Sequence, residues 1–260
     1  MSQAIAVRMI GADFRKVAKK RGTMVWAMVL ALGPLLIFFV VAAAQHSSDP
    51  QNAPAGGLSG YRDALRILAL FFGPLAAILI GTDSGAGDAT AGVFRDMVVT
   101  GRSRLALFGA RVPAALAVTW GVVCVGYALT LIGTFVFASG TPTPGAALLV
   151  DGLGFALLST GVVCVLAVGL SSLTASRPAP LVALIGWHLV ASPILANIES
   201  LGSSRKLVFS QAIEHFSPVR LNGDRGATVT MSGATAAIVL VGWLAVFLAL
   251  GAWRTRTMDA

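Results

Sequence analysis

The stretch TMVWAMVLALGPLLIFFVVAAA, Thr23–Ala44, decides the fold class, because none of its 22 residues carries a charge. A helix rises about 1.5 Å per residue, so about 20 apolar residues cross the hydrocarbon core of a bilayer. Five further apolar stretches follow in this 260-residue chain, of which 56% is hydrophobic. The sequence predicts an all-α membrane protein with six spans. These are Thr23–Ala44, Leu65–Gly81, Val112–Phe137, Ala146–Leu170, Ala179–Ile198 and Ala234–Ala252.

The spans and their loops use nearly the whole length, so we expect residues 1–260 to form one transmembrane domain. No phosphate-binding loop of the GxxxxGK[ST] type, no HExxH pair and no GxSxG elbow occurs. We therefore expect no catalytic, cofactor or metal site in this chain. The net charge of +8 is expected to face anionic lipid headgroups, since basic residues at span ends commonly do so, and we expect no nucleic-acid partner.

The distribution of Lys and Arg predicts the orientation. Thirteen of these residues fall on the side of the two termini and six on the opposite side. Cytoplasmic loops carry the excess of Lys and Arg. We expect a multi-pass protein of a bacterial inner membrane with both termini in the cytoplasm, although four cations in the last outer loop reduce the asymmetry.

The N-terminal segment 1–22 has the pattern of an amphipathic helix. Ile10, Phe14 and Val17 lie at i, i+4 and i+7, opposite six Lys and Arg residues. Such a basic helix is expected to lie flat in the membrane interface. The alternative is that the segment only anchors the topology.

Within the second span, Pro74 is expected to produce a kink. Gly81-x-x-x-Gly85 matches a helix-packing motif, but glycine-rich spans produce such matches often. Asp83 and Arg66 lie near span ends, where we expect their side chains to reach water or headgroups.

The loop 83–105 has the pattern of a cytoplasmic amphipathic helix. We expect the helix to start at Asp88 and to end at Gly101, with Arg95 and Asp96 away from its apolar face. The expected apolar face consists of Val93, Phe94, Met97 and Val98. Such a helix can receive force from a soluble partner, or it can be a connector that rests on lipid.

His188 is the only ionisable residue near the middle of a predicted span. Burying such a group is costly, so it is a functional candidate. Packing, with one or two interhelical hydrogen bonds, is the alternative to a role in handling a substrate or a proton.

The outer loop 199–232 contains a second helical pattern. Phe209, Ile213 and Phe216 follow four-residue or three-residue spacing, and Pro218 ends the pattern. With His188, these three residues form a candidate pathway or outer gate. The alternative is a helix that rests on headgroups.

At these segments the chain resembles permease subunits of the type-2 ABC transporter family. The coupling segment of that family has an acidic residue four positions before Gly-Thr, an apolar run and a Pro-x-Ser-Arg ending. Here Asp88 precedes Gly92 by four, Phe94–Val99 is the run and Ser103-Arg104 is the ending. Val93 replaces the threonine, and Gly101-Arg102 replaces the proline and the residue after it.

The resemblance implies six spans, an N-terminal interfacial helix, a coupling helix and short outer helices before the last span. It also implies a second permease subunit, as a homodimer or heterodimer, and a separate cytoplasmic ATPase that binds ATP and Mg²⁺, so this chain would not itself be an enzyme. The residues expected at the ATPase contact are Phe14, Asp88, Phe94, Arg95, Asp96, Met97, Arg102 and Arg104.

The nearly uncharged spans favour an amphipathic or lipid-like compound or drug over a small ion as the cargo, and the family resemblance implies that this cargo is exported. Two alternatives stay open. An ion- or proton-coupled secondary transporter would require buried carboxylates deep in a span. An integral membrane enzyme that modifies lipids would require clustered His, Asp or Glu at one interface.

Overall fold

The computed structural model describes residues 3–49, 55–92, 103–138, 140–219 and 229–257. Within these residues six helical spans are long and apolar enough to cross a membrane, and no strand occurs. The predicted all-α membrane fold is confirmed. The spans are Arg21–Ser48, Gly57–Thr90, Arg104–Val136, Ala146–Thr174, Pro178–Asn197 and Gly233–Thr257.

Four of the six spans are single, uninterrupted α-helices. They are α2 (Arg21–Ser48), α6 (Arg104–Val136), α7 (Ala146–Thr174) and α11 (Gly233–Thr257). The second and fifth spans each contain a π-helical turn. The second is α3 (Gly57–Arg66), η1 (Ile67–Phe72) and α4 (Gly73–Thr90), and the fifth is α8 (Pro178–Gly186), η2 (Trp187–Ala191) and α9 (Ser192–Asn197).

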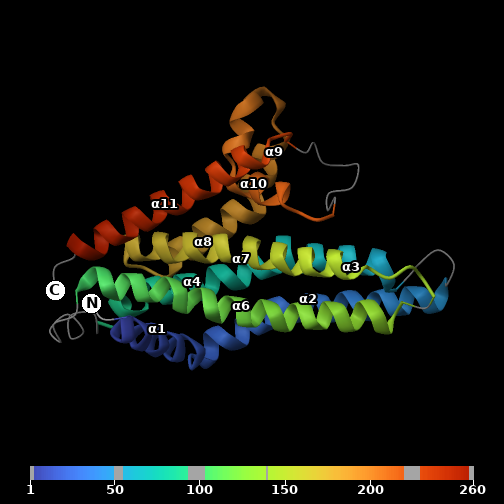
Figure 1. Ribbon diagram of the computed structural model, residues 1–260, viewed down its shortest axis with the longest axis horizontal. Coiled ribbons are helices and arrows are strands. Elements are labelled where there is room, and N and C mark those ends of the chain that lie inside the picture. Colours follow the sequence, from blue (N-terminus) through green and yellow to red (C-terminus); the bar gives the residue numbers. More distant parts are fainter. Residues whose placement is uncertain (1–2, 50–54, 93–102, 139, 220–228, 258–260) are drawn as a thin grey trace.

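Three shorter helices complete the described part of the chain. They are α1 (Gln3–Ala18), η3 (Glu199–Leu207) and α10 (Phe209–His215). The predicted N-terminal helix and the predicted helix in the outer loop are therefore both present. The ends of the chain lie at the same end of the bundle (Figure 1), as an even number of spans requires.

Helices α4 and α7 form the centre of the bundle, with α1 and α2 on one flank and α11 on the other (Figure 1). In the most apolar window of each span, 72% of α7 is buried but only 17% of α11. The peripheral helices α2, α8, α9 and α11 thus present apolar side chains to the outside of the bundle, where a membrane protein contacts lipid.

Helices α4 and α7 touch through Gly81 and Gly85. A Cβ atom on Gly81 would lie 2.7 Å from the carbonyl oxygen of Cys164, and one on Gly85 would lie 2.5 Å from that of Val168. Only glycine permits backbones to approach this closely. The Gly-x-x-x-Gly spacing, ambiguous in the sequence, is a contact surface in the fold.

The second span extends beyond both ends of the predicted Leu65–Gly81, and the predicted helix start at Asp88 is wrong. Asp83 and Asp88 lie inside α4 and are buried. Hydropathy ends a span at the first charges, whereas here charges from other helices neutralise the two carboxylates and allow α4 to continue. The core of the predicted coupling helix, residues 93–102, lies outside the described residues.

Candidate functional site

A group of charged side chains, here called the ionic cluster, surrounds the last turns of α4. It consists of Lys16, Lys20, Asp83, Asp88, Arg111 and Arg177. The cations come from α1, from the α1–α2 junction, from α6 and from the α7–α8 connection. The ionic cluster therefore ties the amphipathic helix and the spans together at the end of the bundle where both chain ends lie.

Asp88 is paired with two cations. Its Oδ1 lies 2.5 Å from Nζ of Lys16, and its Oδ2 lies 2.9 Å from Nη2 of Arg111. The Asp88 and Arg111 side chains are each only 5% exposed, and Nη1 of Arg111 also donates to the carbonyl oxygen of Gly85 at 3.3 Å. A buried pair of this kind is stable only while both members are present.

Asp83 has a fully buried side chain with three partners. Nη2 of Arg177 lies 2.5 Å from Oδ1 and Nζ of Lys20 lies 3.1 Å from the carboxylate. The hydroxyl of Thr23 donates to Oδ2 at 3.3 Å. The prediction that Asp83 reaches water or headgroups is wrong, because cations from two other parts of the chain come to the carboxylate instead.

Asp13 lies beside the ionic cluster on α1. Its carboxylate is 3.5 Å from Nζ of Lys16. Burial raises the pKa of Asp13 above 3.8, and nearby Asp88 adds to that rise, while Lys16 and Arg111 oppose it. The raised pKa means that the ionised form of Asp13 is less favoured than that of a freely solvated aspartate.

The residues predicted to contact an ATPase lie in three different situations. Phe14 is on α1 and is 40% exposed, so its ring is accessible, and Nη1 of Arg104 donates to the carbonyl oxygen of Arg256 at 3.2 Å. Asp88 is buried in the ionic cluster and cannot form a surface contact. The remaining predicted residues, Phe94, Arg95, Asp96, Met97 and Arg102, lie outside the described residues.

A second site lies between the two π-helical turns, η1 and η2. Each turn is followed at the same spacing by a proline, Pro74 after η1 and Pro193 after η2. In η1 the N–H of Gly73 bonds five residues back to the carbonyl oxygen of Leu68. Pro74 has no N–H to offer the next carbonyls, so the expected kink takes the form of a π turn.

Two side chains from other helices form hydrogen bonds with the backbone carbonyl oxygens that lack a donor because Pro74 has no N–H. Oγ of Ser159 in α7 donates to the carbonyl oxygen of Ala69 at 2.6 Å. Nε2 of His188 in η2 lies 2.7 Å from the carbonyl oxygen of Leu70. Backbone groups in a bilayer must be satisfied by protein atoms. His188 therefore has the interhelical hydrogen bond that the packing interpretation requires.

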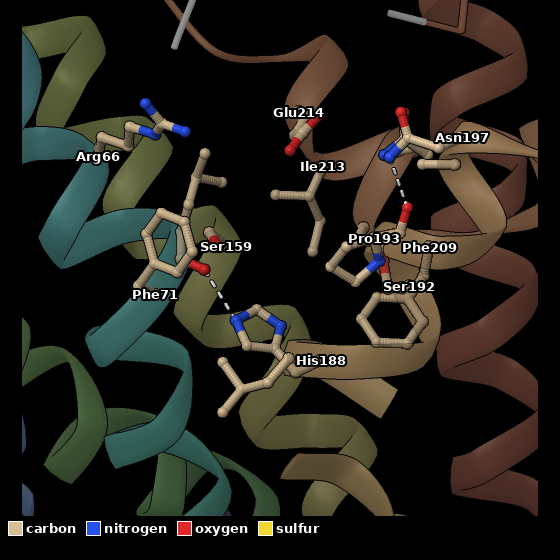
Figure 2. A pocket seen from close by; sticks show the side chains of 15 residues that line it. Arg66, Phe71, Ser159, His188, Ser192, Pro193, Asn197, Phe209, Ile213 and Glu214 are labelled. Carbon is tan, nitrogen blue, oxygen red and sulfur yellow. Dashed lines mark hydrogen bonds between the residues drawn. The ribbon is translucent and has the colours of Figure 1, made fainter. Parts of the chain in front are cut away.

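A cavity of about 320 Å³ opens beside this bond. It is lined by His188, Phe209 and Ile213 from the predicted pathway residues, and by Arg66, Ser159 and Glu214 among others. Figure 2 shows Arg66, Glu214 and Asn197 at one end of the cavity and His188 at the other. The structure thus brings three of the four predicted pathway residues together.

Phe216, the fourth predicted pathway residue, does not line the cavity. It follows the end of α10 and its ring meets that of His215 edge to face, with centroids 5.5 Å apart. Behind the cavity, Trp187 stacks on Phe209 with centroids 6.1 Å apart, and Trp243 of α11 lies 6.2 Å from Trp187. These aromatic rings connect the cavity wall at Phe209 to α11.

Sequence reasoning missed Arg66, Ser159 and Glu214 as site residues. The available signal was the pair Pro74 and Pro193, since each removes a backbone donor inside a span and creates a need for polar partners nearby. Among the residues that the structure describes, no three His, Cys, Asp or Glu side chains are grouped as a metal site would need.

Comparison of the chain with known protein families and with curated proteins finds no match.

Proposed function

We propose that this chain is the transmembrane subunit of an ATP-driven exporter of the type-2 ABC class. It pairs with a second permease subunit and is driven by a separate cytoplasmic ATPase, which binds ATP and Mg²⁺. Its place is a bacterial inner membrane, with both termini in the cytoplasm, and its cargo is an amphipathic or lipid-like compound.

The observation that supports this proposal is the ion pair at the base of the segment 93–102. Asp88 lies two residues before the end of α4, and Arg111 lies seven residues after the start of α6. Their 2.9 Å pair joins the two helices that the segment connects. Lys16 adds α1 to the same carboxylate. A force applied to the segment therefore acts on three helices at once, as coupling to a soluble motor requires.

In this proposal the ATPase contact has an apolar centre and a charged rim. Phe94 and Met97 supply the centre, because buried apolar anchors usually dominate the energy of an interface. Charges at a rim set orientation and association rate more than affinity. The rim residues are Arg95, Asp96, Arg102 and Arg104, and Phe14 of α1 contacts the partner from the side. Asp88 does not contact the ATPase; it holds α4 to α6 through its ion pair with Arg111.

One observation favours an ion-coupled secondary transporter, namely that Asp83 and Asp88 are carboxylates buried within a span. Each is held by two cationic side chains. A carboxylate in such an arrangement is neutralised by fixed partners and does not offer its oxygens to a passing ion. We therefore place the ATP-driven function first.

The test is co-expression of the chain with candidate ATPases, followed by affinity purification. The Phe94→Asp variant should lose the ATPase while its six spans remain inserted. The matched control is Phe216→Asp, the same change at the other end of the described fold, which should retain the ATPase. Unchanged ATPase-driven transport by Phe94→Asp would refute the docking assignment. Transport that follows an ion gradient with no ATPase would refute the proposed function.

A further inference from the structure

Two of the residues that line the cavity beside His188 each carry a buried polar atom that has no hydrogen-bond partner among the described residues. They are Nε of Arg66 and Nδ1 of His188. Buried polar atoms in native structures are nearly always satisfied, so each such exception requires an explanation. Both residues line the same cavity. A ligand in the cavity would supply the two missing partners.

The chemistry of each atom defines what the ligand must offer. The carbonyl of Leu70 can only accept, so Nε2 of His188 carries the proton of that hydrogen bond. In the neutral ring Nδ1 is then an acceptor and requires a donor. Nε of Arg66 is always a donor and requires an acceptor. Figure 2 shows Nδ1 directed away from Leu70, toward the side where Phe209 lies.

The charges at one end of the cavity favour a ligand of no net charge. Arg66 and Glu214 both line it and carry opposite charges. The guanidinium of Arg66 also lies 5.7 Å from the centre of the Phe71 ring, which holds it at this wall. A net anion would be attracted by Arg66 but repelled by Glu214, and a net cation would meet the reverse, so neither sign of net charge is favoured.

The walls and the size of the cavity set the shape of the ligand. Phe71, Phe209 and Ile213 form apolar walls between the charged end and His188 (Figure 2), and Leu70 also lines the cavity. A volume of about 320 Å³ is at the small end for ligand sites. It suits one short chain rather than a two-chain lipid. The π turns on both sides are a feature that recurs at functional sites.

We infer that this cavity binds a short, uncharged amphiphile with a polar group at each end: a carbonyl-type acceptor for Arg66, and a hydroxyl donor for His188. The inference depends on the proposed function in one respect: that the bound compound is also transported. Binding itself belongs to this chain and requires no ATPase.

The test is binding of tritiated 10-hydroxydecanamide to the full chain in phosphatidylcholine nanodiscs, with empty nanodiscs as the blank. We expect saturable binding above the blank. The methyl ether, 10-methoxydecanamide, should compete about tenfold more weakly, because it loses one hydrogen bond to a buried group. His188→Leu should bind both compounds equally weakly.

A second pair of variants keeps the His188 hydrogen bond intact. Ile213→Phe fills the cavity and should abolish saturable binding. Its control, Ile194→Phe, makes the same change on the exposed side of α9 and should leave binding unchanged. Equal affinity of the wild type for the two probes, binding no greater than the blank, or full binding by Ile213→Phe would each overturn the inference. None of these results depends on purification with an ATPase, so the two proposals fail separately.

Discussion

Removing the carboxylate of Asp88 should destabilise the protein far more than removing its partner Lys16. The Asp88→Asn change leaves the 5%-exposed side chain of Arg111 without its carboxylate, and loss of one member of a buried pair costs about 3–5 kcal/mol. We expect the lower end, about 3 kcal/mol, because the charge of Asp13 also acts on this site. Lys16 is 34% exposed, so Lys16→Met should cost about 1 kcal/mol or less.

The double variant Asp88→Asn/Arg111→Met separates charge burial from a general loss of packing. It removes both buried charges, so it should be at least about 1 kcal/mol more stable than Asp88→Asn alone. The assay is the free energy of unfolding in mixed micelles, followed by tryptophan fluorescence as the denaturing detergent fraction rises. The reasoning is refuted if Lys16→Met costs as much as Asp88→Asn, or if the losses in the double variant simply add.

Three further outcomes are expected. Gly85→Ala should lose about 1–3 kcal/mol of stability by overpacking against α7, while Gly121→Ala, which meets no atom within 4 Å, should lose none; equal effects would contradict the close α4–α7 contact. Because burial raises the pKa of Asp13 above 3.8, the contribution of Asp13 to stability falls as pH rises from 3.8 through that raised pKa. The free energy of unfolding of Asp13→Asn should therefore exceed that of the wild type at pH 7, whereas below pH 3.8 the variant should have no such advantage. A wild type that is more stable than Asp13→Asn at pH 7 would exclude the burial argument. A cysteine at Ser48 should react with an impermeant reagent added to intact cells and one at Ser103 should not; reaction at Ser103 alone would reverse the orientation.

Helices α1 and α4 show which parts of the fold the sequence predicts and which it does not. The amphipathic pattern around Val17 predicted α1, and Val17 is indeed buried. The end of the second span was predicted wrongly because hydropathy treats Asp83 and Asp88 as isolated charges. Lys16 is 72 residues away from Asp88 in the chain, and Lys20 is 63 residues away from Asp83. A local sequence pattern cannot predict pairs that are so far apart.

The sequence by itself determined that this chain is a six-span helical membrane protein with a basic amphipathic helix before the first span. It did so because span length and helical periodicity are local properties, fixed by some 20 neighbouring residues. Only the tertiary structure decided that Asp83 and Asp88 continue a buried helix and that Ser159 and His188 complete the backbone hydrogen bonds near Pro74. It alone placed Arg66 and Glu214 on one cavity. Each of these depends on atoms from different helices that meet only when the bundle packs.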